Sequence, residues 1–124
     1  ISQPRIPIWI AGYYPNKAPM RRAAKWDGMF ILYDDAEDKV TALGETMSYI
    51  QSQRKVDSDF EFVFLDQSSY DTSLETRRET AKQVQAVGAT WCLTNIDPRR
   101  YAFDWDEEWD FEQMRETVVQ GPPS

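Results

Sequence analysis

The sequence predicts an α/β fold in which four strand-then-helix units build a parallel sheet. Strand-like apolar runs begin near residues 6, 29, 60 and 89, and a segment with helical character follows each of them. Parallel strands need a crossover connection, usually a helix, and one such unit takes roughly 30 residues. The runs are apolar at nearly every position, as expected of strands that are buried on both faces.

Local signals define the first two units. Residues 6–12 read as a buried strand ending in Gly12, and a helix is predicted over residues 17–26. The second unit has a strand at residues 29–33 and a helix over residues 36–54. One face of that helix is apolar and consists of Val40, Leu43, Met47 and Ile50. Acidic residues crowd its start, which favours a helix N-terminus, where negative charge is stabilised, over a metal site.

The last two units follow the same pattern. A strand at residues 60–66 precedes Thr-Ser-Leu-Glu at residues 72–75, which has the form of a capping box. The helix that follows should end at Gly88, and the fourth strand is predicted at residues 89–96. After a long loop, a final helix should begin at Asp110. Its buried face should be Phe111, Met114 and Val118.

Composition limits the function classes. The 124 residues suffice for one domain with a modest core. A net charge of −7 without a dense basic run argues against nucleic acid and anionic membranes as partners. The chain has no His, the commonest acid–base residue and metal ligand, and its single Cys92 lies in an apolar run typical of a buried thiol. No apolar run approaches the roughly 20 residues of a membrane span, so we expect a reducing, cytoplasmic setting.

The short connections leave open whether the helices cover one face of the sheet or both. Helices of a barrel-like sheet cover only one face, yet several strand side chains are too apolar to leave in water. These are Trp9, Phe62, Phe64, Trp91 and Leu93. Either some helices cross to the other face, or another half of the protein closes against this one. The chain also opens with Ile-Ser-Gln-Pro and no initiator Met, so we expect residues 1–124 to be a single domain from a longer chain.

Together, these segments resemble the luciferase-like flavin-dependent oxidoreductases and monooxygenases, a TIM-barrel family that uses FMN or a deazaflavin coenzyme. Residues 6–12 are similar to the family's fifth barrel strand, and PMRRAAKWDG at residues 19–28 to the helix that enters the sixth. Residues 88–91 resemble the entry to the eighth strand, and residues 114–123 the closing helix. The resemblance implies half of a TIM barrel, strands five to eight, and a small-molecule substrate.

The same resemblance implies candidate site residues. In the family, the coenzyme phosphate is held partly by the loop after the fifth strand and the following helix N-terminus. These positions correspond to Gly12, Tyr13, Asn16 and Lys17. The chemistry of the residues agrees, since glycine permits close backbone approach and asparagine caps helices. A plain strand-to-helix turn, with Asn16 as the cap and Lys17 in solvent, explains them equally.

Substrate-lining positions follow from strand ends. Tyr33, Asp66 and Asn95 are at the C-terminal ends of the second, third and fourth strands, which is the catalytic side of such barrels. Asp and Asn also favour strand ends and turns for structural reasons. The residues that face the flavin ring come mostly from the family's first half-barrel, so no catalytic residue is assigned.

The leading interpretation is the coenzyme-phosphate half of a luciferase-like oxidoreductase that acts by hydride transfer and is inactive alone. Its partner would be the missing N-terminal half-barrel or a second copy of this chain. One alternative is a non-enzymatic, doubly wound βα domain that binds another protein. Another is a binder of a different phosphorylated metabolite at the same turn, which fold analogy does not separate from the first.

Overall fold

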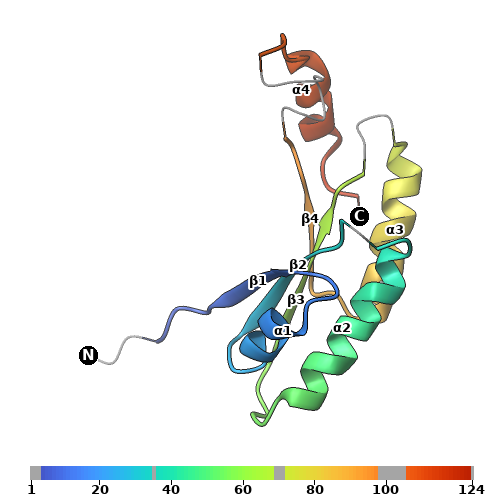
Figure 1. The fold of residues 1–124 in the computed structure, drawn as a ribbon. Coiled ribbons are helices and arrows are strands. Elements are labelled where there is room, and N and C mark those ends of the chain that lie inside the picture. The colour runs from blue at the N-terminus through green and yellow to red at the C-terminus, as the bar shows by residue number, and fades with distance from the viewer. Residues whose placement is uncertain (1–3, 35, 69–71, 98–105, 124) are drawn as a thin grey trace.

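The structure is a computed structural model that describes residues 4–34, 36–68, 72–97 and 106–123 (Figure 1). Strands and helices alternate along the described chain, as the spacing of apolar runs predicts. The elements are β1 (Trp9–Tyr13), α1 (Lys17–Ala23), β2 (Gly28–Leu32), α2 (Lys39–Gln53), β3 (Glu61–Asp66), α3 (Leu74–Val87), β4 (Trp91–Thr94) and α4 (Phe111–Gln120). The α/β class is therefore confirmed.

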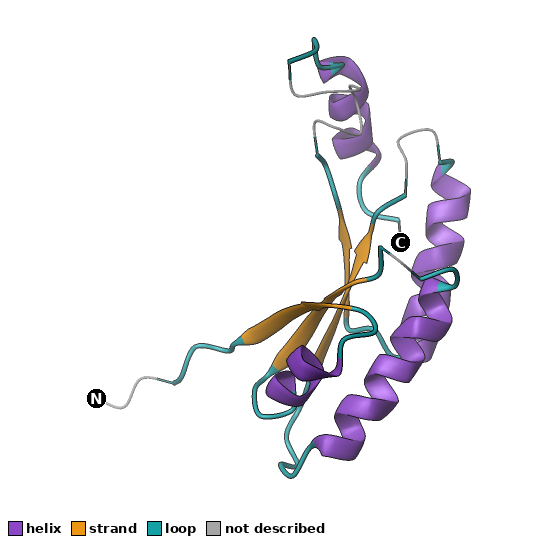
Figure 2. Cartoon of the chain, viewed as in Figure 1, coloured by secondary structure: helices purple, strands orange, loops and turns teal. Residues whose placement is uncertain are grey.

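The four strands form one parallel sheet in the order β1-β2-β3-β4. Because crossovers between parallel strands are right-handed, an order that never reverses places successive helices on the same side of the sheet. Figure 2 shows α1, α2 and α3 together along one side, and α2 packs against both of the others. A doubly wound sheet needs a reversal of strand order, so that alternative is wrong for the described fold.

The core lies between the sheet and these three helices. Strand residues on this side include Met29, Ile31 and Phe64, each 1% exposed. The apolar face predicted for α2 supplies Leu43, Met47 and Ile50 from the other side. Phe62 and Phe64 belong to this covered face, so the expectation that they are left bare is wrong. The alternation of side chains along β3 turns them towards the helices.

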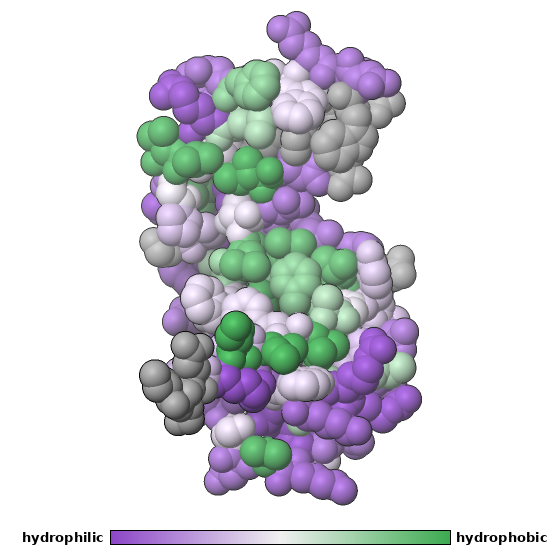
Figure 3. Space-filling view, turned by 90° about the vertical axis from the view of Figure 1, so that its left-hand side faces the viewer, coloured by the Kyte–Doolittle hydropathy of each residue, from purple (hydrophilic) through white to green (hydrophobic). Residues whose placement is uncertain are grey.

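The opposite side of the sheet, which we call the open face, carries no helix among the described residues. Alternation and strand register assign side chains from all four strands to it. They are Trp9, Ala11, Tyr13, Phe30, Leu32, Glu61, Val63, Leu65, Trp91 and Leu93. Figure 3 looks onto this side and shows hydrophobic side chains gathered across its middle.

The helices form where the sequence predicts them, but several of their ends differ: α1 ends at Ala23 and not at residue 26, and α2 begins at Lys39 and not at residue 36. Asp38 caps α2 by accepting from the N–H groups of Val40 and Thr41. Gly88 ends α3 with a φ of 121°, a conformation that glycine adopts without strain. At the start of α3, however, the capping residue is Ser73, which accepts from Thr76 N–H, whereas the capping-box pattern points to Thr72.

The expected burial of α4 is wrong. The helix forms where predicted and is capped by Asp110, yet none of its residues is buried. Phe111 and Val118, two of the three residues expected to pack, are 67% and 60% exposed. The physical reason is its position beyond the C-terminal ends of the strands, away from the layer formed by the other helices (Figure 1). Its amphipathic pattern therefore has no surface of the described chain to cover.

Candidate functional site

The turn between β1 and α1 is the candidate phosphate site, and Gly12 is its first residue. A side-chain Cβ placed on Gly12 would lie 2.5 Å from Cβ and Cγ of Pro19. Pro19 is a buried residue of α1. Glycine at this position therefore lets the first helix approach its strand. The space that a phosphate would need against this side of Gly12 is filled by the chain itself.

Asn16 and Lys17 are also engaged. Asn16 accepts a hydrogen bond from Ala18 N–H at 3.0 Å and so caps α1, as the plain-turn interpretation requires. Its own N–H donates to the carbonyl of Tyr13 at 2.9 Å. The Lys17 ammonium lies 4.3 Å from the centre of the Tyr49 ring, a cation–π contact. At such exposed sites this contact contributes only about 0.5–1 kcal/mol, so Lys17 is the member of the set most readily turned towards an anion.

Tyr33, expected to line a substrate pocket, is instead buried on the helix-covered side. It is 1% exposed, and its ring lies tilted against those of Tyr14 and Phe64, with centroids 6.0 Å away in each case. Its hydroxyl is enclosed and has no hydrogen-bond partner among the described residues. Burial raises the pKa of this phenol above its ordinary value, so it stays protonated.

Asp66 lies on the same covered side, in a buried ion pair with Arg77 of α3. The two residues are 3% and 6% exposed, and Arg77 Nε donates to Asp66 Oδ2 at 3.2 Å. Arg77 Nη2 also donates to Thr94 Oγ1 at 3.1 Å. One side chain of α3 thereby holds the C-terminal ends of β3 and β4 together. Because both charged groups are almost fully buried and paired with each other, this arrangement has a structural role.

Opposing effects set the charge of Asp66. Burial alone would raise the pKa of its carboxyl group, since it disfavours the charged form. The Ser68 hydroxyl and N–H both donate to Oδ1, the latter at 2.9 Å, and Arg77 donates to Oδ2. Together these donors outweigh burial and hold the pKa below its usual range. The Asp66 carboxyl group is therefore ionised at neutral pH.

The sequence-based expectations missed Arg77, although a signal for it exists. Leu74, Arg77, Ala81 and Val84 are spaced as one helical face, and Val84 is buried. A charged residue on an apolar helical face requires a buried partner of opposite charge. Asp66, two residues after Phe64 and hence on the same side of β3, is the acid in register to meet it.

Cys92 also belongs to the covered side, in β4. Burial raises the pKa of its thiol, and the nearby Asp66 carboxylate raises it further, while Arg77 acts in the opposite direction. A thiol with a raised pKa is a poor nucleophile at neutral pH. The structural role expected of Cys92 from its apolar neighbours therefore agrees with its position against the core.

Asn95 follows β4 on the side that alternation assigns to Trp91 and Leu93, and its N–H donates to the carbonyl of Asp66 at 3.4 Å. The seven candidate residues thus share one edge of the sheet, the C-terminal ends of the strands. They do not share a cavity, since Gly12, Tyr33 and Asp66 face the helices whereas Tyr13 lies on the open face and is 57% exposed.

Two tryptophan side chains lie against each other on the open face. Trp9 of β1 and Trp91 of β4 approach each other, with ring centroids 5.8 Å apart. Gly28 makes room for this arrangement, because a Cβ there would lie 2.5 Å from Trp9 Cδ1 and 2.8 Å from the carbonyl oxygen of Glu61. Rings from the first and last strands therefore meet over the middle of the sheet. Trp9 and Trp91 nevertheless remain 38% and 49% exposed.

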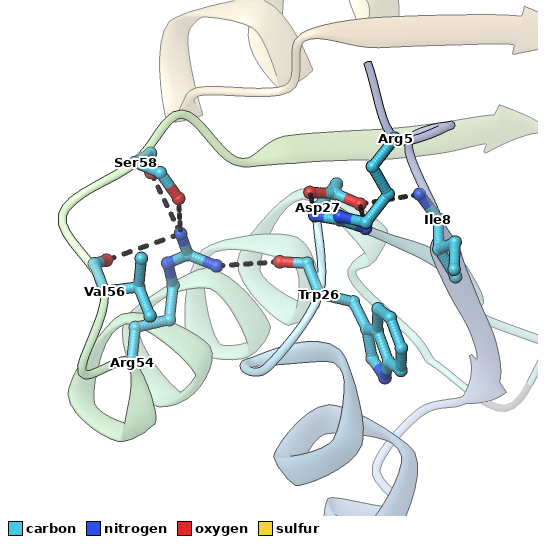
Figure 4. Close-up of polar contacts among 7 residues, drawn as sticks. All are labelled: Arg5, Ile8, Trp26, Asp27, Arg54, Val56 and Ser58. Carbon is cyan, nitrogen blue, oxygen red and sulfur yellow. Dashed lines mark hydrogen bonds and ion pairs between the residues drawn. The ribbon is translucent and has the colours of Figure 1, made fainter. Parts of the chain in front are cut away.

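At the opposite, N-terminal edge of the strands, an ion pair anchors the segment before β1 (Figure 4). Asp27 accepts from both terminal nitrogens of Arg5, at 2.8 and 2.6 Å, and from Ile8 N–H at 2.7 Å. The Arg5 hydrogen bonds are the main reason that the pKa of Asp27 is lowered. Asp27 thus anchors the segment before β1 at this edge, and the neighbouring Gly28 makes room for Trp9 on the open face.

Arg54 stabilises the neighbouring connection from α2 to β3. It donates to the carbonyls of Trp26 at 3.0 Å and Ser58 at 2.9 Å, and to the Ser58 hydroxyl at 2.9 Å (Figure 4). Its guanidinium group also lies 4.6 Å from the centre of the Phe60 ring. These donors satisfy carbonyl groups of the loop and so stabilise the N-terminal edge of the sheet.

Comparison of the chain with protein-family models, with curated proteins and with solved structures finds no match in any of the three. Among the described helices, none has the length and apolar character needed to cross a bilayer.

Proposed function

We propose that this chain supplies the coenzyme-phosphate half of a luciferase-like flavin- or deazaflavin-dependent oxidoreductase, completed by a second half-barrel. The observation that supports the proposal is the open face. Four parallel strands in unbroken order carry α1, α2 and α3 on one side and exposed tryptophans on the other. An eight-stranded βα barrel has helices only outside, and its interior is filled by side chains from every strand.

The partner in this proposal is the missing N-terminal half-barrel or a second copy of the chain. Either would pair with the free edges of β1 and β4 and bury Trp9 and Trp91. It would also offer the exposed apolar residues of α4 a neighbouring surface, which the described part of this chain does not provide. We expect the isolated half to be inactive, because the residues facing the flavin ring would come from the other half.

The residues at the β1–α1 turn fit a coenzyme phosphate only in part. Lys17 can release Tyr49 at small cost and neutralise a phosphate, whereas Gly12 is covered by Pro19 and Asn16 caps α1. Hydride transfer is chemistry that the flavin supplies when bound, and the protein contributes binding and orientation. In the proposed enzyme, the contribution of this chain is the positive charge of Lys17 at the strand C-terminal edge.

The test is a titration of the purified chain with FMN, followed by flavin fluorescence, with mass measured by light scattering. We expect saturable binding in the associated, barrel-sized species and a several-fold loss of affinity in Lys17→Gln. Lys82→Gln is the matched control, because Lys82 is exposed on α3, away from the turn. An associated, folded protein that leaves the fluorescence of FMN and, in a repeat titration, of a deazaflavin coenzyme unchanged contradicts the proposal, as does equal weakening by both variants.

The open face also favours a second candidate function, a protein-interaction domain without an enzymatic role. Exposed aromatic clusters of this kind are typical of interfaces. The two candidates differ in the titration, because a pure interaction domain should associate with another protein and remain colourless. The proposed oxidoreductase is expected to acquire a flavin absorbance band once its barrel is complete.

A further inference from the structure

A basic concavity lies along α1 and beside the C-terminal end of α2, with Ala18 at the start of α1 among its lining residues. Its volume is about 640 Å³. Arg21 and Arg22 come from the last turn of α1, Lys25 follows that helix, and Lys55 follows α2. The two contributing helices pack against each other, so residues about thirty positions apart in the sequence form one hollow.

Four cations around one hollow stand out in a chain of net charge −7. Among the described residues, no carboxylate lines the concavity. Within the same ranges, Arg21, Arg22, Lys25 and Lys55 form no ion pair and no side-chain hydrogen bond. Arg5, Arg54 and Arg77, by contrast, are all bound to carboxylates or carbonyls. The donors of the concavity therefore remain free for a ligand.

Helix dipoles explain this cluster only in part. Basic residues near a helix C-terminus are favourable, which accounts for the sign of Arg21 and Arg22. The carbonyls of Met20, Arg22 and Ala23 at that end, however, already accept from backbone N–H groups. Lys55 follows the C-terminal end of α2, whose dipole favours a cation there in the same way, so the dipoles account for the sign of each segment but not for their convergence. The convergence of both segments on one hollow points to an external anion.

We propose that this concavity binds a small molecule bearing two or more adjacent phosphates. Guanidinium groups bind phosphate oxygens in pairs, and lysines add point charges without demanding one geometry. The volume falls within the range of roughly 300–1,000 Å³ found for small-molecule pockets. An acidic peptide would need cations spread along an extended track, whereas these four surround one compact hollow. The site is independent of the flavin proposal.

The experiment is a calorimetric titration of the full chain with inorganic pyrophosphate at low and at physiological ionic strength. We expect one-to-one, saturable binding that weakens with salt. The double variant Arg21→Gln/Arg22→Gln should weaken it by about tenfold or more, as expected when charged hydrogen bonds are removed. Lys55→Gln should also weaken it, because it supplies the other wall.

Arg78→Gln is the matched control, since Arg78 is an exposed arginine on α3 outside the concavity. Its affinity for pyrophosphate should equal that of the unaltered chain. The proposal is overturned if the double variant binds as before, if Lys55→Gln has no effect, or if Arg78→Gln weakens binding equally. Tighter binding of a hexaglutamate peptide than of pyrophosphate would assign the hollow to a protein partner instead.

The flavin proposal and this one fail separately. FMN affinity should depend on Lys17 and not on Arg21 or Arg22, and pyrophosphate affinity should show the reverse. Circular dichroism of each variant checks folding, which these exposed substitutions should leave unchanged.

Discussion

The two faces of the sheet are built from alternate residues of the same four strands, yet they differ in what covers them. On the helix side, Ile31 and Phe64 are almost fully enclosed, whereas on the open face Trp9 and Trp91 retain much of their exposure. Both faces are apolar. The apolar composition of the strands therefore predicts that both faces of the sheet are to be buried. It does not show which face is covered by helices of this chain and which needs another surface.

The largest loss of stability should come from truncating a buried side chain on the helix-covered face. We expect Phe64→Ala to lower the free energy of unfolding by about 3–5 kcal/mol, because a large enclosed ring is replaced by a cavity. Trp91→Ala on the open face should cost clearly less, since the ring is half exposed. Urea denaturation of the monomer measures both. Equal losses would mean that the two faces are equally buried in solution and would break the comparison.

The buried ion pair provides the next test. Arg77→Met leaves Asp66 without its cation and should cost about 3 kcal/mol, as when one partner of a buried pair is removed. The double change Asp66→Asn/Arg77→Met should recover much of that loss, because no unpaired charge stays buried. The free energy of unfolding from urea titrations decides the matter. A single variant as stable as the unaltered chain would show that the pair is open to water.

A substitution at Gly28 tests how closely the side chains of the open face are packed. Alanine there would push its methyl group against Trp9 and the carbonyl oxygen of Glu61, which should cost about 1–3 kcal/mol through strain. Gly44→Ala is the contrasting variant, because its nearest neighbour, Val87 Cγ1, is 3.4 Å away. Within α2 it should raise stability by up to about 1 kcal/mol. Thermal unfolding of both distinguishes a required glycine from a replaceable one.

The smallest expected effect is on the stability of the chain at acidic pH. The pKa of Asp66 is lower in the folded chain than its usual value of about 3.9 in an unfolded one. Its contribution to stability is therefore complete above about pH 4 and is lost as pH falls through the lowered folded pKa. Between those limits, the unaltered chain should lose stability faster than Asp66→Asn. Parallel pH profiles of the urea midpoint would contradict this assignment.

Much of the fold follows from local sequence, because strands, caps and helix ends depend on neighbouring residues. Gly88 and Asp38 act where their chemistry places them. The exposure of α4 is not predictable from the sequence, because an amphipathic helix indicates that a partner surface exists without showing that this chain contains it. Ser73 replaces Thr72 as a cap because both residues suit the role, and the sequence does not rank them.

The candidate site was less predictable than the fold. The C-terminal ends of the strands are predicted to within two residues, since the fourth strand ends at Thr94 and not at residue 96. Which side of the sheet the helices cover, and hence whether Tyr33 and Asp66 lie beneath them, depends on the strand order, which local sequence patterns do not determine. The use of Gly12 for packing depends on Pro19, a contact across the turn. The basic concavity joins residues from α1 and the end of α2, and only their juxtaposition in space separates it from scattered surface charge.

The unbroken strand order has a consequence for the time course of folding. Each later strand pairs with the one before it in the sequence, so no pairing skips a strand. The parallel partners are nevertheless well separated along the chain, as in Trp9 with Gly28 and Phe64 with Cys92, and the closure of such crossovers makes parallel sheets slow to fold. As in repeat proteins, structure can grow by one unit at a time. We expect the sheet to lengthen from a nucleus of β1, α1 and β2, so that a nascent chain could begin folding while its last strand is still being synthesised.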